Sequence, residues 1–167
     1  MKSLLTTIIV ILTLVSVKGQ LSPDTSKYVI FDDKNSILRS FDKSCKPARL
    51  TDSEIMQIEK LTAYCVDKYN KDQLKYYNKQ SKKEKITDDI EQHILMLDKF
   101  KWQIVPVINA RGDKEVWVNC FRPFTNYKFP YWRQKIVFVN DGGNYFFNIK
   151  INLTKRKCFN LSVNGVA

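Results

Sequence analysis

A change in the spacing of apolar residues near position 100 constrains the fold of this chain more than any other feature. Between residues 50 and 69 apolar side chains recur every three or four positions, whereas from Phe100 onward β-branched and aromatic residues alternate with polar ones. The first spacing is that of an amphipathic helix, and the second is that of strands with one buried face. The sequence therefore predicts an α+β protein in which one long N-terminal helix packs on an antiparallel sheet.

The start of the expected helix is marked by a capping box. Thr51 and Glu54 are spaced so that each side chain can satisfy a free backbone N–H of the first turn, with Leu50 and Ile55 as the accompanying apolar pair. The stripe that the helix should bury comprises Ile55, Ile58, Thr62, Cys65, Val66 and Tyr69.

Lysines accumulate where this apolar stripe weakens. The run comprises Lys68, Lys71, Lys75, Lys79, Lys82, Lys83 and Lys85, opposed by few acids. Two interpretations stay open, namely a solvated face on a fraying helix end and a patch for an anionic partner.

The second half of the chain predicts a meander of four or five antiparallel strands. The expected strands cover residues 102–108, 115–121, 134–139, 145–153 and 158–163, with turns at 109–113 and 141–144. Pro106 cannot donate a ladder hydrogen bond, so the first of these strands is expected at an edge or at a bulge. In the strand 145–153 the odd-numbered residues form an apolar face, and the other face should be mostly wet. The long helix is the expected cover of the apolar face.

The first nineteen residues have the pattern of a secretory signal. Lys2 precedes a fourteen-residue apolar stretch, and small residues lead to a cleavage point after Gly19. That stretch is shorter than the ~20 residues of a membrane span. We expect an exported mature chain, periplasmic or extracellular, without a transmembrane span. Residues 20–48 are expected to be a partly ordered leader and residues 49–167 the helix-plus-sheet domain.

The charge balance favours anionic partners. The chain has 28 Lys and Arg against 17 Asp and Glu, and removing residues 1–19 deletes two lysines, so the formal charge falls from +11 to 26 − 17 = +9. Such a field speeds encounter with an anionic glycan, an envelope surface or an acidic protein, and export disfavours nucleic acid.

Four cysteines at positions 45, 65, 120 and 158 allow three pairings, and both disulfides and free thiols stay open. No cysteine or histidine spacing indicates a metal site, and no glycine-rich phosphate loop or dinucleotide motif indicates a cofactor. His93 is the single histidine, and no activating motif surrounds any cysteine, so catalysis is disfavoured.

The segment from Phe121 to Trp132 holds six aromatic residues, two prolines and no acid. Aromatic faces can stack on sugar rings, and prolines reduce the entropy lost on binding, so this loop is the candidate binding surface. The alternative is that the rings fold back over an open end of the sheet as a secondary core. The candidate binding residues are Arg122, Phe124, Tyr127, Lys128, Tyr131, Trp132 and Arg133.

Two N-x-S/T sequons occur, at Asn152-Leu153-Thr154 and at Asn160-Leu161-Ser162. Both lie in or at the end of predicted strands, and both matter only in a eukaryotic secretory pathway.

One helix followed by antiparallel strands, over roughly residues 50–165, resembles the cystatin-like arrangement, in which a sheet wraps a single helix. Cystatin inhibitors of cysteine proteases also carry a Q-x-V-x-G loop; here Gln103-Ile104-Val105-Pro106-Val107 has the Gln and the Val, with Val107 in place of the Gly. The stretch 141–152 also looks like small exported bacterial proteins of unknown role.

The expected function is non-catalytic binding of an anionic glycan or protein partner. The alternatives are a cystatin-type protease inhibitor, which the resemblance implies, and a small hydrolase that uses the open face of the sheet.

Overall fold

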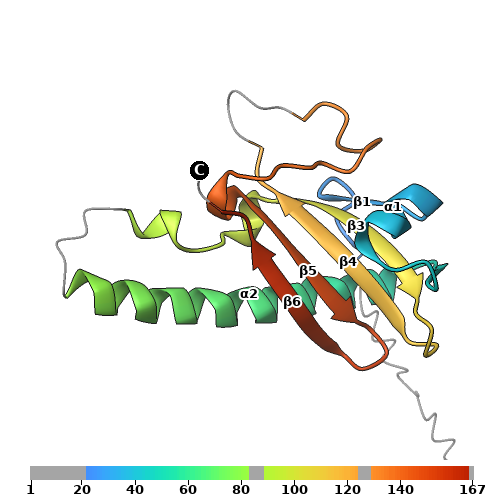
Figure 1. The fold of residues 1–167 in the computed structure, drawn as a ribbon, viewed down its shortest axis with the longest axis horizontal. Helices are drawn as coiled ribbons and strands as arrows, with labels where there is room; N and C mark the ends of the chain where they lie inside the picture. Colours follow the sequence, from blue (N-terminus) through green and yellow to red (C-terminus); the bar gives the residue numbers. More distant parts are fainter. Residues whose placement is uncertain (1–21, 83–88, 124–128, 166–167) are drawn as a thin grey trace, which may run out of the picture.

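The computed structural model describes residues 22–82, 89–123 and 129–165, and it confirms an α+β protein with one long helix (Figure 1). The predicted signal at residues 1–19 lies outside these ranges. The elements are β1 (Tyr28–Ile30), α1 (Lys34–Ser40), β2 (Lys46–Pro47), α2 (Asp52–Ser81), η1 (Ile90–Gln92), η2 (Leu97–Lys99), β3 (Lys101–Ile108), β4 (Lys114–Phe121), η3 (Gly143–Tyr145), β5 (Phe146–Asn152) and β6 (Lys157–Val163).

The sheet is mixed, which corrects the expectation of an antiparallel meander led by the long helix. Its order is β1-β3-β4-β5-β6, with β2 also paired to β3. The strands from β3 to β6 follow one another antiparallel, but β1 lies parallel to β3, with Tyr28 opposite Trp102. Residues 22–48 supply β1, α1 and β2, because the short apolar run at Tyr28–Ile30 finds an open side of β3.

β3 lies inside the sheet, so the prediction that its proline places it at an edge or a bulge is wrong. On the side that faces away from β4, β3 pairs with two short strands. β1 pairs with Trp102–Ile104 and β2 pairs with Val107–Ile108. The carbonyl of Pro106 accepts from the Ala48 amide on this side. The proline therefore faces the gap between β1 and β2, where its missing N–H interrupts neither pairing.

The predicted strand at 134–139 is also wrong: this segment crosses the sheet without joining it. The side-chain amides of Gln103 and Asn119 form hydrogen bonds with its backbone, in place of a neighbouring strand. Gln103 donates to the carbonyls of Trp132 and Lys135 and accepts from the Val137 amide at 2.8 Å, while Asn119 donates to the Val137 carbonyl at 2.9 Å. β4 already pairs with β3 and β5, so the sheet offers no position next to it.

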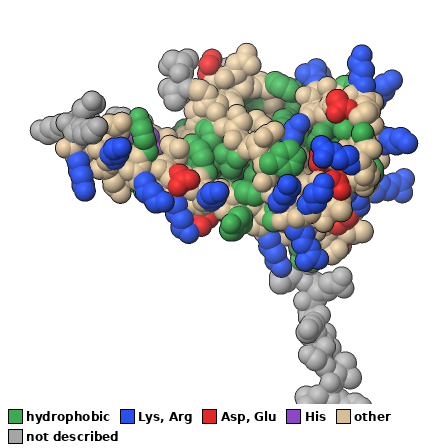
Figure 2. All heavy atoms as spheres, turned by 60° about the horizontal axis from the view of Figure 1, so that its bottom comes forward, with side chains coloured by type: hydrophobic (Ala, Val, Ile, Leu, Met, Phe, Trp, Pro, Cys, Tyr) green, Lys and Arg blue, Asp and Glu red, His purple; other side chains and the backbone are tan. Residues whose placement is uncertain are grey.

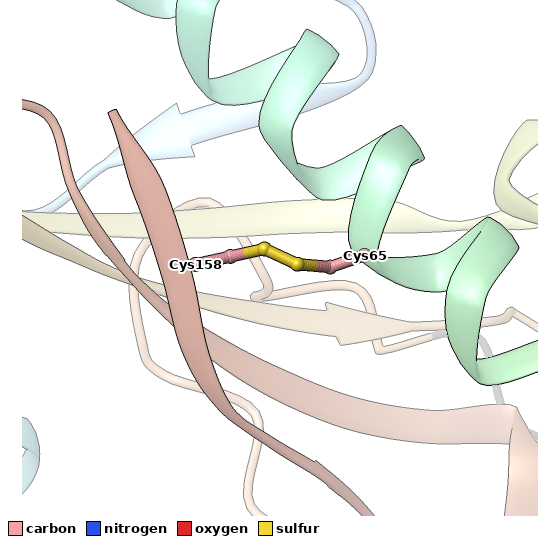
Figure 3. The surroundings of a disulfide bond; sticks show 2 residues. All are labelled: Cys65 and Cys158. Atoms are coloured by element: carbon pink, nitrogen blue, oxygen red, sulfur yellow. A yellow bond between two sulfur atoms is a disulfide. The ribbon is translucent and has the colours of Figure 1, made fainter. Parts of the chain in front are cut away.

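The predicted helix is confirmed, and four of the six residues of its stripe are buried, whereas Cys65 and Tyr69 are half-buried against the core. Ile55, Ile58, Thr62 and Val66 are buried, and the main core joins this stripe to residues of β3, β4 and β5 such as Ile104, Val118 and Ile149. Cys65 of α2 forms a disulfide with Cys158 of β6, which tethers the helix to the edge strand (Figure 3). Cys45 and Cys120 are free thiols.

The second face of the sheet is covered more than expected. Ile37 of α1 packs with Val105, Val107 and Trp117, and Ile136 of the crossing segment packs against the same cluster. On β5, Phe146 and Asn152 are buried and Asn148 and Lys150 are half-buried, so this face is not mostly wet.

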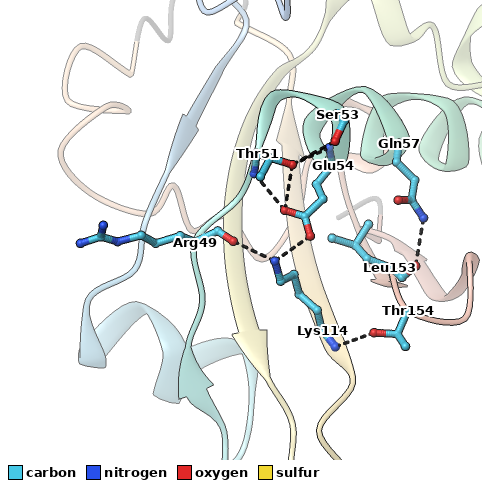
Figure 4. Close-up of polar contacts among 8 residues, drawn as sticks. All are labelled: Arg49, Thr51, Ser53, Glu54, Gln57, Lys114, Leu153 and Thr154. Atoms are coloured by element: carbon cyan, nitrogen blue, oxygen red, sulfur yellow. Dashed lines mark hydrogen bonds and ion pairs between the residues drawn. The ribbon is translucent and has the colours of Figure 1, made fainter.

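The first turn of α2 is fixed to the sheet by Lys114 (Figure 4). The capping box is present, with Thr51 and Glu54 in the expected roles. The Lys114 ammonium donates to Glu54 at 2.6 Å and to the Arg49 carbonyl at 3.1 Å, and Gln57 donates to the Leu153 carbonyl at 3.0 Å. These contacts orient α2 so that its C-terminal part extends past the strands (Figure 1). Within the described ranges no helix is both long enough and apolar enough to cross a bilayer.

Candidate anion-binding surfaces

The predicted loop residues fall into three groups. Phe124, Tyr127 and Lys128 lie outside the described residues. The Arg122 guanidinium lies over the Tyr145 ring at 4.6 Å, and Tyr131 is 63% exposed. Trp132 and Arg133 are in contact with each other, with the guanidinium 4.4 Å from the indole ring.

Two rings of the loop fold back on the end of the sheet. Phe121 of β4 contacts Phe129 at 5.2 Å and Trp132 at 5.8 Å between ring centroids, and Phe129 also contacts Phe146 at 5.9 Å. All three contacts are edge-to-face, a geometry that aromatic pairs favour. For Phe129 and Trp132 the secondary-core interpretation is therefore the one that the structure describes.

Arg133 anchors the loop through its guanidinium. It donates to the carbonyls of Thr25 at 2.9 Å and of Ser26 and Tyr28 at 3.2 Å each, and Lys101 donates to Ser26 at 3.1 Å. Three of the five guanidinium N–H groups are thus engaged with backbone. These donors are committed to holding the loop against the segment before β1.

A more regular set of cations lies on α2. We call it the lysine strip; its members are Lys60, Lys68, Lys71, Lys75, Lys79 and Lys82, the last being the C-cap. With 3.6 residues per turn, these positions fall within an arc of about 100° and extend over about 33 Å of helix. The centre of the arc is about 150° from the buried stripe, and Tyr64 lies within it. The side chains of the six lysines and of Tyr64 are all exposed.

The strip keeps most of its charge. Residues 60–82 contain six lysines and two acids, a net charge of +4. Asp67 pairs with Lys71 at 2.6 Å and Asp72 pairs with Lys75 at 3.5 Å. Within the described part of the chain, no carboxylate pairs with the other four lysines. Figure 2 shows Lys and Arg side chains along the projecting arm, with few acidic side chains between them.

The opposite side of the arm is held by the segment that returns to the sheet. The Asn70 amide exchanges two hydrogen bonds with the backbone of Leu95, at 2.8 and 2.9 Å. His93 lies against the Tyr77 ring, with 5.0 Å between centroids. These contacts support the strip as helix, whereas Lys83 and Lys85 of the predicted run lie outside the described residues.

The strip and the loop lie on opposite faces of the sheet. α2 covers the face formed by Ile104, Val118 and Ile149, and the segment that follows the loop covers the face formed by Val105 and Trp117 (Figure 1). Both surfaces could be identified from the sequence, but their placement on opposite faces of the sheet is visible only in the fold.

The cystatin motif is not displayed as a loop. Residues 103–107 lie inside β3, and Gln103 is 0% exposed with its amide engaged by the crossing segment. A protease could reach this run only if the sheet came apart.

Neither free thiol is prepared for nucleophilic attack. Complete burial raises the pKa of Cys120 well above its ordinary value, and burial followed by the nearby Asp42 charge raises the pKa of Cys45. A reactive cysteine needs the opposite shift.

Among the described carboxyl groups, no resolved pKa shift favours acid catalysis. Every resolved shift of a carboxyl pKa among the described residues is downward, as in Asp33 and Asp113, where hydrogen bonds to Ser36 and to Lys155 are the largest causes. A general acid at neutral pH needs a raised pKa. Within the same ranges, no three His, Cys, Asp or Glu side chains gather as metal ligands would.

An open cavity of about 490 Å³ lies beside the N-terminal half of α2. Its lining includes Tyr28, Met56, Leu97 and Trp102, together with charged residues of both signs. Asp24 lies 3.9 Å from Lys27 in this lining. The lining holds one serine, Ser22, and its hydroxyl makes no hydrogen bond to a side chain of the described residues, so the cavity shows no activated nucleophile that would support the hydrolase alternative.

Comparison of the chain with family models, with curated proteins and with solved structures finds no match.

Proposed function

We propose that this chain is an exported, non-catalytic binding protein that holds an anionic polysaccharide along the lysine strip of α2. The observation that carries the proposal is the placement of six exposed lysines on one side of a helix, opposite its buried stripe. A solvated helix face needs neither this clustering of like charge nor an arm that extends past the sheet.

A polysaccharide fits the strip better than an acidic protein does. The strip is straight, convex and repetitive, as is a linear polymer with an anionic group on successive sugars. The cores of protein interfaces are instead depleted in lysine and enriched in aromatic residues, methionine and arginine. Tyr64 offers one ring within the strip on which a sugar could stack.

Export is proposed from the apolar N-terminal stretch, and two further observations support it. The Cys65–Cys158 disulfide suits an oxidising compartment, and a mature charge of +9 suits encounter with surface polyanions. We also propose a cystatin-like architecture for residues 50–165, supported by one helix against the consecutive strands β3 to β6. Protease inhibition is not proposed, because its motif is buried.

The test compares a strip variant with a charge-matched control. Lys68→Gln, Lys75→Gln and Lys79→Gln together remove three charges from the strip. The control variant removes three exposed lysines elsewhere, at Lys34, Lys43 and Lys157. Binding of the mature chain to immobilised heparin, a sulfated polysaccharide, is measured at low salt.

Two opposite unit charges 4 Å apart attract each other by about 1 kcal/mol in water. Three such lysine–anion contacts therefore contribute about 3 kcal/mol to the binding free energy before screening by salt. We expect the strip variant to bind at least tenfold more weakly and the control less than threefold. Equal weakening of both variants would reduce the effect to net charge and contradict the strip. Loss of binding in Tyr131→Ala would assign it to the loop, and binding only to an acidic protein would contradict a glycan partner.

A further inference from the structure

The two sequons of this chain lie in very different surroundings. Asn152 ends β5 and is 3% exposed, whereas Asn160 is exposed on β6. β6 is the last strand in the sheet order, so among the described residues it has a neighbouring strand on one side only. The folded protein can therefore carry a large group at one sequon and not at the other.

The first sequon is closed on both of its reactive positions. The Asn152 amide donates to Asp113 at 3.1 Å and to Glu115 at 2.9 Å, and its carbonyl oxygen accepts from the Lys155 amide at 2.8 Å. The hydroxyl of Thr154 accepts from the Lys114 amide at 2.9 Å. A sugar on the Asn152 nitrogen would replace one of its two amide hydrogens, so the contact to Asp113 or to Glu115 would be lost, and the sugar would have to enter a buried site.

The second sequon occupies an outward bulge. Asn148 pairs with Ser162 and Lys150 pairs with Phe159, so Ile149 alone faces Asn160 and Leu161. Two residues opposite one define a β-bulge. Asn160 has φ 50°, a left-handed conformation that asparagine tolerates better than most residues. Leu161 packs toward the core, while Asn160 and Ser162 are both exposed.

We infer that Asn160 is an N-glycosylation site and that Asn152 is not. The inference rests on the proposed export and applies to secretion through a eukaryotic pathway. The sugar donor is an oligosaccharide joined to a lipid diphosphate, used by a transferase of that pathway. The Asn160 nitrogen forms a bond to C1 of the first sugar, the bond from C1 to the phosphate oxygen breaks, and the lipid diphosphate leaves with the electron pair. The amide proton passes to a base of the transferase.

A glycan at Asn160 would also protect the sheet. An edge strand presents unpaired backbone groups on which another chain can pair. The glycan would stand on the edge strand itself, so secretion without it should leave a protein that associates more readily.

The experiment expresses the full chain with its own N-terminal stretch in a eukaryotic secretory cell line. Protein from the medium is compared on a gel before and after treatment with a peptide N-glycosidase. The variants are Asn160→Gln, Ser162→Ala, which keeps the asparagine at the bulge, and Thr154→Ala, which removes the first sequon as a matched control.

We expect the wild-type chain and Thr154→Ala to lose the mass of one glycan on treatment, and Asn160→Gln and Ser162→Ala to show no change. A secreted wild-type chain without a shift, or a shift lost only in Thr154→Ala, would overturn the inference. If the chain does not reach the medium, the export proposal fails. The same variants are then expressed with a secretory signal of the host in place of residues 1–19, and their gel shifts decide whether Asn160 is glycosylated.

Discussion

Removing the bridge between Cys65 and Cys158 tests how the long helix is held on the sheet. The bridge joins positions 93 residues apart in sequence, and closing a loop of that length in the unfolded chain corresponds to about 4.6 kcal/mol at 25 °C. Measured effects of native disulfides are commonly smaller, about 2–4 kcal/mol. We expect the double variant Cys65→Ser, Cys158→Ser to lose that amount of its free energy of unfolding.

The assay is urea unfolding and thermal unfolding of residues 20–167, each monitored by circular dichroism. The thermal midpoint should fall by roughly 5–15 °C, and a reducing agent should lower the stability of the wild-type chain similarly. Cys45→Ser is the control, because Cys45 is a free, half-buried thiol, and it should change stability by less than about 1 kcal/mol. A double variant within about 0.5 kcal/mol of the wild type, with no effect of reductant, would refute the reasoning.

Three further predictions concern single side chains. Burial alone would raise the pKa of Glu54, but hydrogen bonds from Lys114 and Thr51 outweigh it and lower that pKa below its ordinary value of 4.5. Ionised Glu54 therefore stabilises the fold at pH values above 4.5. In urea unfolding at pH 7, Glu54→Gln should lower the free energy of unfolding by about 1–2 kcal/mol, and this difference should shrink as the pH falls below 4.5. A difference that stays constant with pH would contradict the assignment. Gln103→Leu removes the side-chain partner of the Trp132 and Lys135 carbonyls and of the Val137 amide, so it should cost at least about 2 kcal/mol and speed tryptic cleavage at Lys135. Unchanged cleavage would show that other contacts hold the crossing segment. Gly142→Ala should lower the free energy of unfolding by about 1–3 kcal/mol in a thermal unfolding experiment, because φ at this position is 95° and the added Cβ would lie 2.6 Å from the Phe146 ring. A variant as stable as the wild type would mean that the turn relaxes freely.

The parts of the fold that could be predicted from the sequence depend on local physics. The capping box at Thr51 and the 3.6-residue stripe after it determine a helix and its buried side without knowledge of the partner surface. The two-residue alternation in β5 likewise identifies which side chains enter the main core.

What could not be predicted depends on distant partners. Residues 134–139 have the composition of a strand, but Gln103 and Asn119 take their backbone groups, and no local pattern indicates this. The parallel pairing of β1 rests on three residues, too few to show a period. Pro106 correctly marked a missing donor, but the gap between β1 and β2 that accommodates it belongs to the assembled sheet.

The candidate surfaces show the same division. The lysine run was visible as composition, and helical geometry places it on one side of α2. That the loop residues Phe129 and Trp132 pack against Phe121, on the far face of the sheet from the strip, follows only from the fold.

The proposed polysaccharide surface is tested most directly by mapping amide chemical shifts of isotope-labelled residues 20–167 during titration with a sulfated oligosaccharide. We expect the amide signals from Lys68 to Lys82 to shift together and saturate, and those of Tyr131, Trp132 and Arg133 to stay in place. Shifts confined to the loop, or none in α2 when binding is complete, would contradict it.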